Sequence, residues 1–160
     1  MLMSKIDDTI ATVFRQVSMN RFEHLIHTKR REEGELSAED FCAAWIETQA
    51  PMFGDSVTLS EDYRWWWSYI PHFLHTPGYV YAYAFGELLV LALYARYKKE
   101  GEAFSEAYLN LLSSGGSNWP HELVAPLGVD LRDPTFWADG VAAIGEMVSE
   151  AERLAAELSA

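Results

Sequence analysis

The sequence has little cysteine and little positive charge. Cys42 is its one cysteine among 160 residues, so no disulfide can form within the chain. The 12 Lys and Arg residues face 24 Asp and Glu residues, which gives a formal net charge of −12. Nucleic acids and anionic membrane surfaces are bound by clustered basic side chains. We therefore expect neither a nucleic-acid partner nor a membrane partner.

The chain also lacks an N-terminal secretion signal and a run of apolar residues free of charge. With a single cysteine and no such signal, the reducing cytoplasm is the predicted compartment. The one membrane candidate runs from Tyr79 to Tyr97 and is long enough to span a bilayer, but Glu87 lies in its middle. A carboxylate at that depth costs about 3 kcal/mol. We therefore expect this segment to be a helix buried in protein.

The composition and the spacing of apolar residues predict an all-α fold. Hydrophobic residues make up 49% of the chain, as in one globular domain, and we see no repeat or linker that divides residues 1–160. Apolar residues recur at helical spacing along most of the chain, which indicates about six or seven helices. We expect these helices from Ser4 to Gly34, Ser37 to Ala50, Glu61 to Ile70, Tyr79 to Lys99, Glu102 to Leu112, Pro120 to Ala125, and from Asp133 onward.

Several helix ends carry specific signals. Ser37 followed by Asp40 is a capping-box pattern, and Asp133 before a proline is a typical N-cap. Pro51 predicts the end of the second helix, because a residue that precedes proline avoids helical backbone angles.

Two histidine patterns resemble metal sites and are incomplete. His24 and His27 have the spacing of two ligands on one helix face, but no third or fourth ligand lies nearby in the sequence. His121 and Glu122 begin an HExxH pattern whose fifth position is Ala125 instead of histidine. We therefore predict no metal ligands in this chain.

Histidines and tyrosines cluster around one turn. His72 and His75 precede the turn at Pro77 and Gly78, and three tyrosines follow it, namely Tyr79, Tyr81 and Tyr83. Neutral phenols and imidazoles donate hydrogen bonds, so such a group could hold a peptide carbonyl or its oxyanion. Tyrosines at helical spacing also pack in ordinary cores. The residues alone leave both interpretations open.

The order of several motifs resembles one enzyme family. The run IPHFLHTPGYVYAYAFG at 70–86 follows TVFRQVSMNRFE at 12–23 and precedes LGVDL at 127–131 and DPTFW at 133–137. Together these motifs are similar to the C-terminal part of oligoendopeptidase F, a family of zinc metallopeptidases related to thimet oligopeptidase. The resemblance covers nearly the entire chain.

The resemblance implies a helical wall of a substrate channel in which a zinc-activated water cleaves short peptides. The family holds its zinc with HExxH and a further glutamate, and this chain has neither. The resemblance therefore implies that this chain holds no cofactor and that zinc is bound in the full-length enzyme. It also implies that the chain has no activity without an upstream catalytic segment. It assigns binding of the substrate carbonyl and oxyanion to His72, Tyr79 and Tyr83. His75 and Tyr81 are implied as further substrate-binding residues.

The sequence leaves two functions of different classes. In the first, the chain is a fragment of an oligoendopeptidase F-like enzyme and is inactive alone. In the second, it is a stand-alone helical module that binds peptides or proteins through its aromatic face. Either way, a truncated domain exposes more apolar surface than a monomer usually does. We therefore expect a homo-oligomer, with a dimer as its simplest form.

Overall fold

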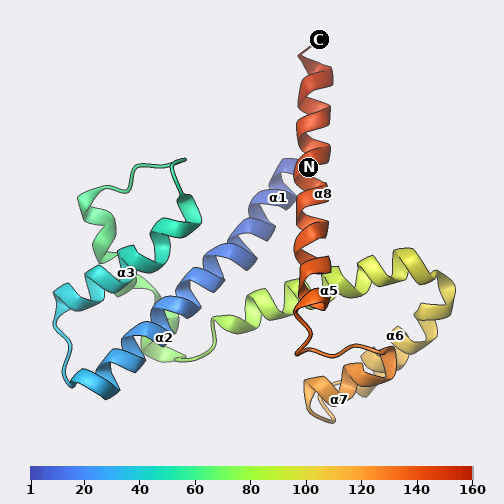
Figure 1. Ribbon diagram of the computed structural model, residues 1–160, viewed down its shortest axis with the longest axis horizontal. Helices are drawn as coiled ribbons and strands as arrows, with labels where there is room; N and C mark the ends of the chain where they lie inside the picture. Colours follow the sequence, from blue (N-terminus) through green and yellow to red (C-terminus); the bar gives the residue numbers. More distant parts are fainter. Residues whose placement is uncertain (160) are drawn as a thin grey trace. The chain divides into compact units, whose positions relative to one another are not determined.

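The computed structural model describes residues 1–159, which form helices joined by short connections and contain no β-strand (Figure 1). The predicted all-α fold is confirmed. Contacts divide the chain into two compact units, one formed by Asp7–Phe85 and the other by Met1–Ile6 with the residues from Gly86 onward. The assignment of residues 1–160 to one domain stays a prediction.

Eight α-helices and three short helices of other types follow one another in the described part of the chain. They are α1 (Leu2–Ile10), the π-helical η1 (Ala11–Arg15), α2 (Gln16–Glu33), α3 (Ala38–Phe53), the 3₁₀-helical η2 (Glu61–Tyr69), α4 (Pro71–His75), α5 (Tyr81–Glu100), α6 (Glu102–Ser114), α7 (Pro120–Val124), the 3₁₀-helical η3 (Ala125–Leu127) and α8 (Pro134–Leu158).

The two predicted caps are present, and several helix ends differ from the prediction by a few residues. Ser37 and Asp40 form the capping box at the start of α3, and the Asp133 side chain accepts a hydrogen bond from the Thr135 N–H at the start of α8. The first helix begins before Ser4, since the Lys5 N–H already donates to the Met1 carbonyl. Helix α3 continues past Pro51 to Phe53, because a proline in the last turn removes only one helical hydrogen bond.

Residues 61–69 form a 3₁₀-helix where we expected an α-helix. With about three residues per turn, side chains three apart lie above one another. Tyr63, Trp66 and Tyr69 form such a row, with ring centroids 5.0 Å apart in the first pair and 6.0 Å in the second. The tighter helix thus aligns three aromatic rings, which an α-helical twist would spread around the axis.

The unit of residues 7–85 is built on the α2–α3 pair, which lies side by side in Figure 1. Phe22 of α2 and Trp45 of α3 are fully buried, with ring centroids 5.2 Å apart in an edge-to-face arrangement. Their cluster also contains Ile70 and Val80, which lie on either side of α4. The segment that carries His72 and Tyr79 is thereby attached to the main core of this unit.

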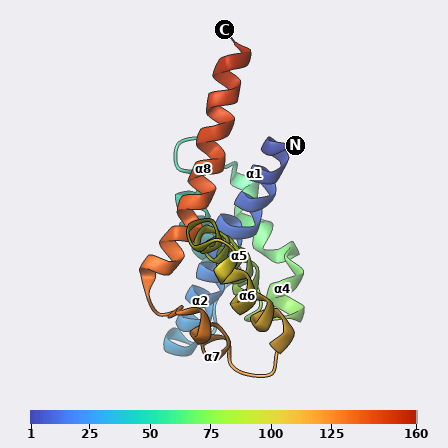
Figure 2. The ribbon, with the colours of Figure 1, turned by 90° about the vertical axis from the view of Figure 1, so that its right-hand side faces the viewer.

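The second unit has a core of its own between α5, α6, α7, η3 and α8. Its buried residues include Leu93, Phe104, Val124 and Phe136. Figure 2 shows α8 as one long helix whose C-terminal end extends beyond the other helices of this unit. No helix in residues 1–159 combines the length and the apolar character that crossing a bilayer requires, and this includes α5, which contains most of the Tyr79–Tyr97 run.

Candidate functional site

The structure brings His72, Tyr79 and Tyr83 together. His72 lies on α4, Tyr79 follows the turn after α4, and Tyr83 lies in the first turn of α5. The Nε2 atom of His72 is 2.9 Å from the Oη atom of Tyr83. The rings of Tyr79 and Tyr83 meet edge to face, with centroids 5.5 Å apart, and the rings of His72 and Tyr79 are parallel at 6.3 Å. We call these three side chains the His72 cluster.

The His72 cluster lies at the surface. The exposed fractions are 48% for Tyr79 and 37% for Tyr83, and His72 is half-buried. The alternative interpretation, in which these tyrosines pack in a core, is therefore wrong. Both tyrosines are therefore accessible from the surface.

His75 and Tyr81 do not join the cluster. Tyr81 has an exposed fraction of 56%, and His75 is also exposed. Within residues 1–159, neither side chain has a hydrogen bond or ring contact with the three cluster residues. Helical geometry explains this for Tyr81, because a residue two positions from Tyr79 or Tyr83 points to a different side of α5.

Two apolar residues anchor the segment that carries the cluster. Phe73 follows His72 and packs on Phe22 of α2, with ring centroids 5.0 Å apart. Val80 follows Tyr79 and is fully buried in the same core. Because each anchor is next in sequence to a cluster residue, core packing sets where the imidazole and the first phenol emerge.

A buried carboxylate also contacts this segment, and the sequence analysis did not assign it a role. Glu23 of α2 has an exposed fraction of 4%, and its Oε1 atom accepts a 2.6 Å hydrogen bond from the Gly78 N–H. A signal for it was available, since Met19, Phe22 and Ile26 form the apolar stripe of α2 and Glu23 lies on the same face. An acidic residue within an apolar stripe indicates a specific partner.

The cluster is suited to hydrogen bonding with an oxygen ligand. If His72 Nε2 carries the proton, it donates to Tyr83 Oη, which leaves the phenolic proton of Tyr83 free to donate outward. Tyr79 supplies a second phenolic donor beside it. Two neutral donors at one point fit a carbonyl oxygen or an oxyanion.

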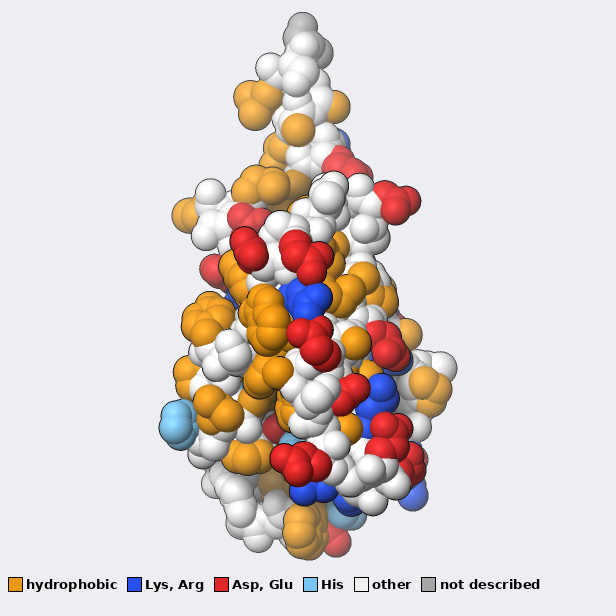
Figure 3. All heavy atoms as spheres, turned by 90° about the vertical axis from the view of Figure 1, so that its left-hand side faces the viewer, with side chains coloured by type: hydrophobic (Ala, Val, Ile, Leu, Met, Phe, Trp, Pro, Cys, Tyr) orange, Lys and Arg blue, Asp and Glu red, His pale blue; other side chains and the backbone are white. Residues whose placement is uncertain are grey.

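The histidine patterns of the sequence do not form metal sites among the described residues. No group of three or more His, Cys, Asp or Glu side chains there could hold a metal ion. His24 and His27 are both exposed on α2, and His27 Nε2 lies 3.9 Å from Glu23 Oε1. The charge on the surface does not suggest a basic site either, since acidic and apolar side chains predominate on the face in Figure 3.

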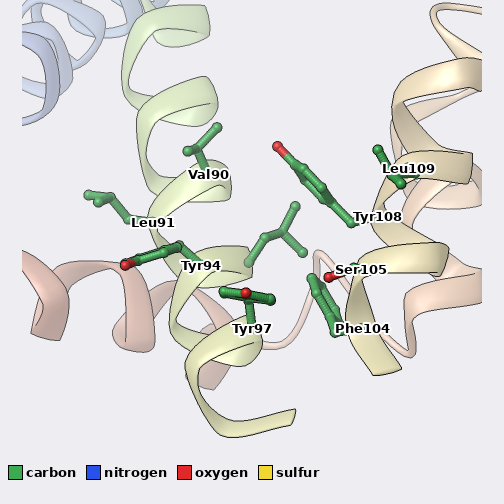
Figure 4. Close-up of a pocket in the computed structure, with 9 residues that line it drawn as sticks. Val90, Leu91, Tyr94, Tyr97, Phe104, Ser105, Tyr108 and Leu109 are labelled. Carbon is green, nitrogen blue, oxygen red and sulfur yellow. The ribbon is translucent and has the colours of Figure 1, made fainter. Parts of the chain in front are cut away.

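A second surface feature lies in the other unit, between α5 and α6. A cavity of about 590 Å³ is lined almost entirely by apolar and aromatic side chains (Figure 4). The tyrosines Tyr94, Tyr97 and Tyr108 contribute to its wall, and Leu109 of α6 has an exposed fraction of 60%. We call this feature the α5–α6 groove.

The comparisons with known proteins all find similarity to peptidases. The model of peptidase family M3 matches residues 1–143. The chain is 37% identical over 123 residues to oligopeptidase PepF of Bacillus subtilis, and this match covers 77% of the chain and 18% of the relative. It is 30% identical over 152 residues to group B oligopeptidase PepB of Streptococcus agalactiae, with 95% and 25% covered.

A solved structure agrees with these sequence matches. The chain superposes with a TM-score of 0.85 on a crystal structure from Chlamydophila abortus of a protein considered a peptidase, at 28% identity, over 93% of this chain and 25% of that one. The chain thus spans between 18% and 25% of the length of these relatives.

Proposed function

Because the chain belongs to peptidase family M3, we propose that it is the C-terminal part of an oligoendopeptidase F-like enzyme that hydrolyses short peptides. The whole enzyme's activity is not contained in this chain. Its role is to supply the substrate-binding wall that carries the His72 cluster. The observation that supports this role is the surface pair of half-buried His72 and exposed Tyr83, whose polar atoms lie 2.9 Å apart.

In this proposal the cluster acts by hydrogen bonding. The phenols of Tyr79 and Tyr83 donate to the carbonyl oxygen of the scissile bond and hold it more strongly as negative charge develops on that oxygen. His72 orients the Tyr83 hydroxyl through the 2.9 Å contact. His75 and Tyr81, which are also exposed, contact more distant parts of the peptide.

In this proposal the zinc ligands of the enzyme lie outside this chain. Family M3 is a metallopeptidase family, and a catalytic zinc needs three protein ligands. The described residues offer no group that fits this requirement. We therefore propose that zinc is held by an upstream catalytic segment and that the chain alone is inactive. We also propose that it works in the cytoplasm, in keeping with its single cysteine.

A chimaera tests this function. In it, residues 1–160 replace the matched region of Bacillus subtilis oligopeptidase PepF. We expect the chimaera to cleave a quenched fluorescent peptide and the isolated chain to cleave none and to bind no stoichiometric zinc. Zinc-dependent cleavage by the isolated chain would show that it carries a complete active site, which contradicts the proposal.

The α5–α6 groove supports a second candidate function. A groove of about 590 Å³ with an apolar lining is typical of a surface that binds an apolar partner. We propose that, as a stand-alone module, the chain binds a second copy of itself or a partner helix through this aromatic face. Both candidates predict self-association of the isolated chain, so the observation that separates this one is binding of a partner helix at the groove by the isolated chain.

A further inference from the structure

The starting observation is the environment of Glu23. Its side chain is almost completely buried on α2, and only one of its two oxygen atoms is satisfied. Oε1 accepts the hydrogen bond from Gly78, whereas Oε2 is buried without a hydrogen-bond partner in the described part of the chain. The nearest basic group is His27 Nε2, at 3.9 Å from Oε1, on an exposed side chain.

Burial of this carboxylate is costly for the fold. A buried carboxylate needs compensation by partners, and here its hydrogen-bond donor is one backbone N–H. An apolar side chain at this place in the stripe of α2 would avoid that cost. The hydrogen bond fixes the position of Gly78, since a hydrogen bond to a carboxylate is stronger than one between neutral groups.

Gly78 lies in the turn between α4 and α5. Its φ is +76°, a backbone conformation that favours glycine. The neighbouring backbone hydrogen bonds, from Thr76 N–H to the His72 carbonyl and from Ala82 N–H to the Tyr79 carbonyl, lie on either side of this turn. The bond to Glu23 therefore holds the turn at its centre.

We propose that Glu23 is a positioning residue for the His72 cluster. It fixes Gly78, and because Tyr79 is the next residue, it fixes the phenol of Tyr79 beside His72 and Tyr83. Phe73 and Val80 attach the segment to the core at its two ends, and Glu23 supplies the polar contact between them. The catalytic consequence, an effect of Glu23 on turnover, rests on the proposed function. The structural consequence, the fixed position of Gly78, does not.

The structural consequence is tested on the isolated 160-residue chain. Amide hydrogen exchange is followed by NMR in wild type, Glu23→Ala and Glu23→Gln, with Glu32→Ala as the matched control on the exposed face of α2. We expect the Gly78 amide to exchange about ten- to a hundredfold faster in Glu23→Ala. Glu23→Gln retains an acceptor oxygen and should restore most of the protection. Glu32→Ala should exchange as wild type does.

Two outcomes would overturn the proposal. One is an unchanged Gly78 exchange rate in Glu23→Ala. The other is equal acceleration of all amides of residues 7–85 in both Glu23 variants, which would make Glu23 a residue of the general fold rather than of this turn. Neither outcome depends on whether the chain is part of a peptidase.

The catalytic consequence is tested in the PepF chimaera. Misplacement of a donor lowers the rate of the chemical step more than it lowers ground-state binding. We expect Glu23→Ala to reduce kcat roughly tenfold or more with little change in KM, and Glu23→Gln to recover most of the loss. An equal kcat for Glu23→Ala and Glu32→Ala would contradict this part. Absence of activity in the unmodified chimaera would contradict the proposed function and leave the exchange result standing.

Discussion

The Nε2 atom of His72 and the Oη atom of Tyr83 lie 2.9 Å apart although eleven positions separate the residues in sequence. A turn at Gly78 and two anchors, the buried Val80 and the partly buried Phe73, bring them together. If the pair serves an oxyanion, each donor should matter for turnover more than for binding.

Tyr83→Phe removes one hydroxyl and keeps the ring. We expect kcat of the chimaera to fall about a hundredfold with KM nearly unchanged, because an oxyanion donor acts mainly in the transition state. Steady-state kinetics on a quenched peptide measures this. Tyr69→Phe is the control, since Tyr69 is an exposed tyrosine on η2, outside the cluster. Similar losses in the two variants would exclude a specific role for Tyr83.

Gly140 of α8 approaches α5 so closely that a methyl group does not fit. A Cβ atom there would lie 2.8 Å from the carbonyl oxygen of Leu88. We expect Gly140→Ala to lower the free energy of unfolding by about 1–3 kcal/mol, measured by urea denaturation. Gly145→Ala on the same helix meets nothing within 4 Å and should raise stability by up to about 1 kcal/mol. Equal effects of the two substitutions would show that this approach is not tight.

The capping box of α3 makes a pH-dependent contribution to stability. Hydrogen bonds from the Ser37 side chain and backbone lower the pKa of Asp40 below its ordinary value of 3.8. The ionised form is therefore favoured in the folded state. Its contribution is present above pH 4 and is lost as the pH falls through the lowered pKa.

Asp40→Asn tests this contribution. We expect the variant to be less stable than wild type at pH 7 and the difference to shrink at pH 3, with both measured by urea denaturation. Ser37→Ala should cost about 1 kcal/mol at pH 7, the usual value for loss of an N-cap. A stability gap between wild type and Asp40→Asn that is the same at both pH values would contradict the assignment.

The α5–α6 groove predicts that the isolated chain self-associates. Light scattering at micromolar concentrations should give a mass above that of the monomer, and Leu109→Glu should shift it toward the monomer by placing a charge at the groove. Val57→Glu is the control, since Val57 is similarly exposed in the other unit. A monomer at all concentrations would rule out self-association through this face.

The sequence alone determined the helical class, the caps and the grouping of the site residues. Helical periodicity, the Ser37–Asp40 pattern and the Asp133 N-cap are local properties, since each depends on residues within about one turn. The same is true of the close spacing of His72, Tyr79 and Tyr83 around one glycine. Local chemistry was therefore sufficient to predict the helices and these caps, whereas the choice of His72, Tyr79 and Tyr83 as the site rested on the family resemblance.

The tertiary structure decided what depends on residues far apart in the chain. The link from Glu23 to Gly78 spans 55 positions, and the exposure of the tyrosines follows from Phe73 and Val80 taking the core positions beside them. The 3₁₀ form of residues 61–69 and the close approach of Gly140 to the Leu88 carbonyl oxygen were likewise apparent only in the structure. Periodicity specifies which faces are apolar, but only packing determines which residues those faces meet.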